Sequence, residues 1–191
     1  MAHDVLHAAG MPKRSLRLLW FCVIATTLTA SRASAQTETY SAVAVVKTAA
    51  GASSSVPLTA VVRRYATSEE RQSLLAAIKQ GGAASAHALL LKRDDVGTLD
   101  VGGHQVPIKY AYAWDAGQHL ITLVTAEPIA FANMRHKPGY DVGFVLFELS
   151  PSKPGKGEFC PASKVHVDAD GAIVTENSSA ETVMLQNVAR K

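Results

Sequence analysis

The stretch VPIKYAYAWDAGQHLITLVTA, residues 106–126, decides the fold expected for this chain. Its first half places a large side chain at every second position: Val106, Ile108, Tyr110, Tyr112 and Trp114. This period of two is typical of a half-buried β-strand with one aromatic side. Residues 115–117 (DAG) have the composition of a turn, and residues 118–126 are again rich in apolar and β-branched side chains. The stretch therefore predicts an antiparallel hairpin.

Further strands are expected on both sides of this hairpin. Apolar, β-branched runs occupy residues 40–47, 56–66, 140–149, 165–167, 172–175 and 182–188. Turn signals rich in Gly, Asp, Ser and Pro separate them. About eight or nine short strands of this kind predict an antiparallel β-sandwich or barrel.

Between the second and third expected strands the apolar period changes to that of a helix. Residues 67–70 (TSEE) match a capping box, and Leu74, Leu75 and Ile78 follow on one helical face. A second helix is expected over residues 83–92, with Gly81–Gly82 as the link. The expected fold class is therefore α+β, mainly β, with an inserted αα-hairpin.

The N-terminus indicates a secretory signal peptide over residues 1–35. Residues 11–17 (MPKRSLR) are basic, residues 18–28 are apolar, and Ala33 and Ala35 precede Gln36 at a cleavage site for signal peptidase. Translation starts at Met1 with a longer basic region, or at Met11. The apolar run is shorter than the roughly 20 residues that span a bilayer. We therefore expect a single β-rich domain over residues 36–191, secreted or periplasmic, with no stable membrane anchor after cleavage.

The charge of the expected mature chain argues against nucleic acid as a partner. The whole chain has 19 Lys and Arg against 16 Asp and Glu, but residues 1–35 hold four of the basic and one of the acidic residues. Residues 36–191 thus carry 15 of each, and no net basic field remains. Cys160 is the single cysteine after cleavage, so no intramolecular disulfide is expected. It is interpreted as an inert half-buried thiol, with an intermolecular disulfide as the alternative.

Motifs for metals and cofactors are lacking in the sequence. The DADG turn at residues 168–171 resembles part of a calcium loop, but His166 and Asn177 stand where the first and last ligands belong. Histidines 87, 104, 119, 136 and 166 form no pair at the spacings that share one face. The chain contains no G-x-S-x-G, H-E-x-x-H, P-loop or G-x-G-x-x-G motif. No cofactor and no metal are expected.

The aromatic side of the central hairpin is the candidate for ligand contact. Tyr110, Tyr112 and Trp114 would suit an apolar or sugar ligand at the opening or in a groove of a barrel. Packing into the core is the alternative, because any core-facing strand shows the same alternation.

The chain resembles a group of uncharacterised secreted bacterial proteins. The matching stretches are ITLVTAEPIAF (121–131), YDVGFVLFELS (140–150), KGE (156–158), EN (176–177), VMLQNV (183–188) and the TSEERQSLLAAIK helix (67–79). In that group the loop after the central strand carries a longer acidic stretch, whereas here it is SPSKPGKG. The resemblance implies export and a shared fold, and it implies no activity or catalytic residue.

Two classes of function follow, and the favoured one is a non-catalytic exported domain that binds a protein or small-molecule partner. The alternative is a hydrolase-type enzyme with a site assembled from distant strands, for which His104, His119 and Asp141 are candidates. Such an enzyme would bring at least three polar side chains with perturbed protonation into one concavity. A small-molecule or lipid carrier is a further possibility, and it would need an apolar void of about 300 Å³ or more in the barrel.

Overall fold

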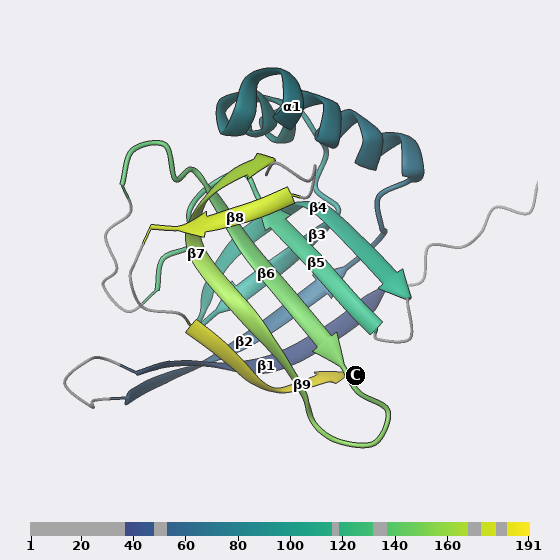
Figure 1. Ribbon diagram of the computed structural model, residues 1–191. Helices are drawn as coiled ribbons and strands as arrows, with labels where there is room; N and C mark the ends of the chain where they lie inside the picture. Colours follow the sequence, from purple (N-terminus) through teal and green to yellow (C-terminus); the bar gives the residue numbers. More distant parts are fainter. Residues whose placement is uncertain (1–36, 48–52, 116–118, 132–136, 168–172, 179–182) are drawn as a thin grey trace, which may run out of the picture. The chain divides into compact units, whose positions relative to one another are not determined.

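β-Strands dominate the computed structural model, which describes residues 37–47, 53–115, 119–131, 137–167, 173–178 and 183–191 (Figure 1). The strands are β1 (Glu38–Lys47), β2 (Ser53–Val62), β3 (Gly97–Val101), β4 (His104–Asp115), β5 (His119–Thr125), β6 (Val142–Leu149), β7 (Gly155–Val167), β8 (Ile173–Asn177) and β9 (Val183–Arg190). The single helix among these residues is α1 (Ser68–Leu91). The expected signal peptide and its cleavage site lie outside the described residues.

Eight of the strands form a closed antiparallel barrel. Strands β1 to β7 each pair with the next along the chain, and β9 pairs with both β7 and β1. The ring therefore closes with β9 between the first strand and β7, and β8 pairs only with the C-terminal part of β7. Closure removes the free edges that an open sheet would present. The prediction of a mainly β, antiparallel fold is confirmed, and of its two alternatives the structure shows the barrel.

Strand β7 extends into a segment that the sequence indicates as a loop. Residues 150–157 (SPSKPGKG) carry turn-forming residues, yet β7 begins at Gly155. A Cβ atom at Gly155 would lie 2.5 Å from the Glu148 carbonyl oxygen, and one at Gly157 would lie 2.1 Å from that of Leu146. These two glycines therefore permit the close approach of β6 and β7. The composition of residues 150–157 alone does not show whether these glycines form a turn or belong to a strand that lies close to its neighbour.

The barrel interior is filled by apolar side chains. Its largest fully buried members are Tyr40, Phe147 and Phe159, and alanines of β1, β2 and β4 lie among them. The segment after β5 covers the end of the barrel near Phe159. There the ring of Phe131 contacts that of Phe159 edge to face, with 5.2 Å between centroids, and the Ile129 amide donates to the Pro161 carbonyl at 2.8 Å. The core is thus continuous from the strands into this cover.

A β-bulge in β4 divides the expected aromatic side into two faces. Ile108 pairs with Thr125 and Tyr110 pairs with Val124, so Lys109 is an extra residue in β4. Ile108 consequently lies in the barrel core, whereas Tyr110 packs outside the barrel under α1. The unbroken alternation expected over residues 106–114 is therefore wrong beyond Ile108, because one inserted residue exchanges inward and outward positions.

Helix α1 packs on the outside of the barrel (Figure 1). Its capping box is confirmed: the Glu70 amide donates to Thr67 Oγ1, and the Thr67 amide donates to the Glu70 carboxylate. The predicted αα-hairpin is wrong, because the structure has one inserted helix with a kink at Gly81 and Gly82. Gly82 has φ +62°, which a glycine adopts at little cost, so the glycine pair bends the helix and does not separate two elements.

Four apolar side chains attach α1 to the outer face of the barrel, over strands β4 to β7. They are Leu74, Ile78, Ala86 and Leu90, and they form a second core with Tyr110, Val124 and Val142. By length and composition alone α1 would also pass as a membrane span. Helices that pack on the core of a soluble protein meet the same criterion.

We expect Phe159→Ala to lower the free energy of unfolding by about 3–5 kcal/mol, because it leaves a cavity in the barrel core. Urea denaturation measures the loss. The control Trp114→Ala removes a side chain that is 59% exposed and is expected to change stability by no more than about 0.5 kcal/mol. Equal losses in the two variants would contradict the assignment of Phe159 to the core.

Candidate functional site

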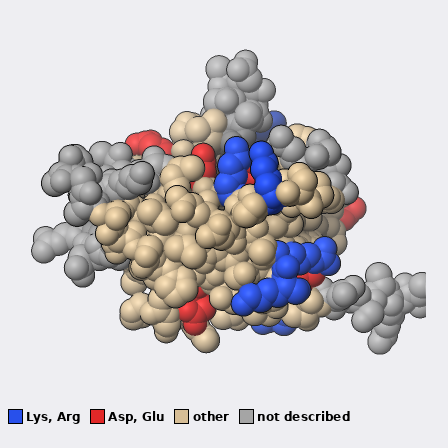
Figure 2. Space-filling model, turned by 90° about the horizontal axis from the view of Figure 1, so that it is seen from below, with Lys and Arg blue, Asp and Glu red and all other residues tan. Residues whose placement is uncertain are grey.

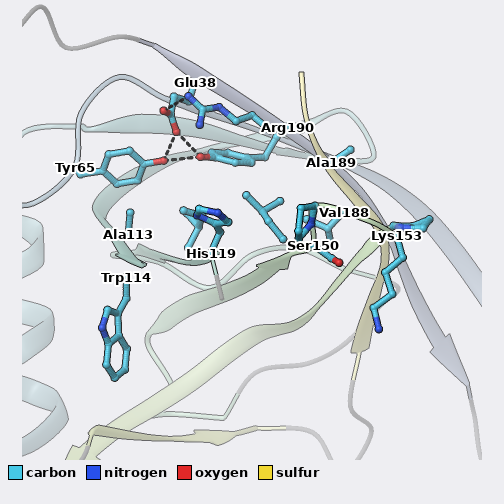
Figure 3. A pocket seen from close by; sticks show the side chains of 15 residues that line it. Glu38, Tyr65, Ala113, Trp114, His119, Ser150, Lys153, Val188, Ala189 and Arg190 are labelled. Carbon is cyan, nitrogen blue, oxygen red and sulfur yellow. Dashed lines mark hydrogen bonds and ion pairs between the residues drawn. The ribbon is translucent and has the colours of Figure 1, made fainter. Parts of the chain in front are cut away.

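A concavity with a polar lining lies at the end of the barrel opposite the Phe131 cover. This mouth pocket has a volume of about 560 Å³ and is formed by strand ends together with the loop between β6 and β7 (Figure 3). It is lined by Glu38, Tyr40, Tyr65, Ala113, Trp114, His119, Ile121, Leu149, Ser150, Pro151, Lys153, Pro154, Val188, Ala189 and Arg190. The lining therefore combines apolar side chains with hydroxyl and charged groups. Glu38, Tyr65 and Arg190 lie together on one side, which we call the polar side, and His119 and Ser150 lie across from them (Figure 3).

Three oxygen atoms meet on the polar side of the mouth pocket (Figure 3). The hydroxyls of Tyr40 and Tyr65 both donate to Oε2 of Glu38, the second at 2.6 Å, and the two hydroxyl oxygens lie 2.6 Å apart. We call Glu38, Tyr40 and Tyr65 the oxygen triad. The guanidinium of Arg190 donates to the other carboxylate oxygen, Oε1, of Glu38. The carboxylate thus receives hydrogen bonds on both of its oxygens.

Strand pairing brings the triad and Arg190 together. Glu38 and Tyr40 are two residues apart on β1, so they point to the same side of the sheet. Tyr40 pairs with Arg190 of β9, and Tyr65 follows the end of β2, the other neighbour of β1. The Tyr40 ring packs on Phe147 with 5.6 Å between centroids, so it is anchored in the core while its hydroxyl reaches the pocket.

The electrostatics of the triad keep Glu38 ionised and both tyrosines protonated. Burial acts to raise the pKa of Glu38, but the hydrogen bonds from Tyr40, Tyr65 and Arg190 outweigh it, and the pKa is lowered from its ordinary value. Burial and the hydrogen bond to Glu38 raise the pKa of Tyr40 to about 12. The same two causes raise the pKa of Tyr65, with a further contribution from its contact with Tyr40.

A second concavity lies between α1 and the barrel. This α1 groove has a volume of about 240 Å³ and is lined mainly by apolar side chains of α1 and of strands β4 to β8. Its lining residues are Arg71, Leu74, Ile78, Ala86, Leu90, Tyr110, Tyr112, Trp114, Thr122, Val124, Phe144, Val165 and Thr175. The groove is therefore distinct in chemistry from the mouth pocket.

The aromatic residues singled out from the sequence lie on the outer face of β4. The rings of Tyr110 and Tyr112 stack with 6.4 Å between centroids, under the guanidiniums of Arg93 and Arg71 respectively. Tyr110 is buried and packs against α1, whereas Trp114 is exposed and lines both the mouth pocket and the α1 groove. Ligand contact by Tyr110, Tyr112 and Trp114 stays a prediction, for which the exposed Trp114 has the best position.

The structure does not bring the three candidate enzymatic residues together. His119 lines the mouth pocket, but His104 begins β4 at the opposite end of the barrel. Asp141 precedes β6 at that opposite end as well. The polar groups that do converge, Glu38 and Tyr65 among them, were not singled out from the sequence. The period-two spacing of Glu38 and Tyr40 is a weak signal, and the partner Arg190 is 152 positions away.

The described residues contain no group of three or more His, Cys, Asp and Glu side chains that could hold a metal ion. Cys160 is buried and free, and burial raises the pKa of its thiol, which disfavours the reactive thiolate. Charged side chains on the face shown in Figure 2 stand in small groups, with basic and acidic residues close to one another and wide uncharged areas between.

Comparison with protein-family models, curated proteins and solved structures gave no match. The functional argument therefore depends on the geometry of the two concavities.

We expect Glu38→Gln to flatten the dependence of stability on acid pH. The pKa of Glu38 is lower in the folded than in the unfolded protein, so the unfolded state binds more protons as the pH falls below about 4.5. The stability that Glu38 contributes is full above that pH and is lost as the pH falls through the folded pKa. Urea denaturation between about pH 6 and pH 3 measures the slope. The control Glu158→Gln, on the exposed face of β7, is expected to retain the wild-type slope. Identical slopes in wild type and Glu38→Gln would contradict the assignment.

At alkaline pH we expect the tyrosines of the triad to ionise late. The near-ultraviolet absorbance of tyrosinate is expected to show a component near pH 12 that belongs to Tyr40. Stability conferred by the protonated hydroxyl is present below pH 10 and lost as the pH rises through about 12. In Glu38→Gln this component moves to lower pH, because the carboxylate no longer accepts the hydrogen bond. An unchanged titration curve in that variant would show that the carboxylate does not hold the hydroxyl proton.

Proposed function

We propose that this protein is an exported, non-catalytic binding protein whose mouth pocket takes a small polyhydroxylated molecule of the sugar class. The observation that carries the proposal is the convergence of Glu38, Tyr40, Tyr65 and Arg190 on one side of a pocket that is also lined by the exposed indole of Trp114. Export, to the periplasm or beyond the cell, rests on the signal-peptide pattern of residues 1–35. Membership of the secreted bacterial group that the sequence resembles belongs to the same proposal.

The hydrogen-bonding capacity of the oxygen triad supports a ligand that carries hydroxyl groups. Each tyrosine has one hydroxyl proton and donates it to Glu38, so toward a ligand its oxygen is an acceptor. Arg190 supplies donors beside these acceptors. A sugar hydroxyl is both donor and acceptor, and its ring has an apolar face that suits an exposed indole such as Trp114. The pocket volume lies within the range usual for small-molecule sites.

The same geometry gives weaker support to an enzyme. Three polar side chains with shifted pKa values do meet in one concavity, which is the arrangement that a hydrolase-type site would need. Efficient general acids and bases, however, have a pKa near the working pH. Here the pKa of Glu38 moves down and those of Tyr40 and Tyr65 move up, so each shift leads away from neutrality. These directions favour recognition over proton transfer.

A carrier with an apolar barrel cavity has less support, because the interior is occupied. Tyr40, Phe147 and Phe159 fill the barrel between the mouth pocket and the Phe131 cover. A ligand in the mouth pocket would therefore rest on the core and would not enter it.

A thermal-shift screen against mono- and disaccharides, amino acids and short carboxylates tests the proposal. A ligand at 100 times its Kd stabilises the folded state by about 2.7 kcal/mol, which raises the Tm by several degrees. We expect a saccharide to give this shift and Glu38→Gln to weaken its binding about tenfold, because without the carboxylate the two tyrosine hydroxyls are no longer held with their acceptor oxygens toward the ligand. The control Glu158→Gln is expected to bind as wild type does. No shift with any saccharide, or a shift undiminished in both Glu38→Gln and Trp114→Ala, would overturn the proposal.

A further inference from the structure

The α1 groove has the chemistry of a site for an amphipathic anion. On the helix side its walls are Leu74, Ile78 and Leu90, and on the barrel side they include Val124 and Phe144. An apolar cavity of about 150 Å³ accommodates benzene. The groove, at about 240 Å³, therefore has room for an apolar group of roughly eight to twelve carbon atoms.

Arg71 is the one charged side chain in the lining of this groove. Its guanidinium carbon lies 5.3 Å from the centroid of the Tyr112 ring, in a cation–π contact. A guanidinium over an aromatic ring keeps the N–H donors on its edge free to bind a carboxylate in a bidentate way. The ring contact therefore holds the cation in place without occupying its hydrogen-bonding edge.

Within the described part of the chain, no carboxylate forms an ion pair with Arg71. The neighbouring acid Glu70 is bound by Arg64, with distances of 2.9 and 3.0 Å between guanidinium nitrogens and carboxylate oxygens, and it also accepts from the Thr67 amide. The capping box and Arg64 thus occupy the acid nearest to Arg71 in sequence. Arg71 thus places a positive charge at an apolar groove, while Glu70 is bound by Arg64. This arrangement is complementary to a bound anion that has an apolar tail.

We propose that the α1 groove binds a small amphipathic carboxylate. The carboxylate pairs with Arg71, and an apolar chain of about eight to twelve carbon atoms lies between α1 and the outer faces of β5 and β6. The site lies outside the barrel and shares only Trp114 with the mouth pocket, so it goes beyond the binding function proposed above.

Calorimetric titration of the full chain with octanoate, and with octanol as the uncharged probe, tests this proposal. We expect octanoate to bind about tenfold more tightly than octanol, and Arg71→Gln to abolish that preference. The matched control Lys79→Gln removes a positive charge from the exposed surface of the same helix and is expected to leave both affinities unchanged. Thr122→Phe, which fills the groove from the β5 side, is expected to prevent binding of either probe.

Three results would overturn the proposal. The first is no heat of binding with octanoate, and the second is an octanoate affinity that Arg71→Gln leaves unchanged. The third is loss of octanoate binding in Glu38→Gln, which would place the probe in the mouth pocket. Circular dichroism checks that each variant is folded, and Thr175→Phe fills the groove from β8 if Thr122→Phe does not fold.

Discussion

The pairing of β1 with β9 is the constraint on which the rest of the structure depends. Strand β9 enters between β1 and β7, and its hydrogen bonds to both complete the ring of eight strands. Closure buries Tyr40 and Phe147 in the same core, and it places Arg190 beside Glu38. The barrel core and the polar side of the mouth pocket therefore arise from one pairing between the two ends of the described chain.

The oxygen triad shows how a part-buried carboxylate is compensated at such a closure. Taking Glu38 out of water costs free energy, and two phenol hydroxyls and a guanidinium together more than offset the effect of burial on its pKa. The tyrosines in turn are held as donors by the carboxylate. Such a network is fixed in geometry because each member restrains the others, which suits a binding surface better than a group that must exchange protons.

Local features of the fold could be predicted from the sequence, and long-range features could not. The Thr67–Glu70 capping box and the strand periodicity depend on residues within a few positions of one another, so both can be recognised in the amino-acid sequence. The bulge at Lys109 could not be predicted, because it depends on how β4 pairs with β5. The role of Gly157 could not be predicted either, because it depends on how closely β6 approaches β7. The mouth pocket was missed for the same reason, because its lining comes from β1, β4, β5, β6 and β9 and from the segments after β2 and β6, whereas aromatic alternation pointed to the outer face of β4.

The extra residue in β4 limits how this chain can change in length. Up to Ile108 the strand directs one set of side chains inward, and beyond Lys109 it directs the other set, so that Ala111 faces the core and Tyr110 faces α1. Deletion of one residue at this point would remove the bulge. The tyrosine side chains would then face the barrel core at positions that alanines now occupy. A change of length therefore costs more free energy in the middle of this strand than in the connections between strands, where added residues cost little.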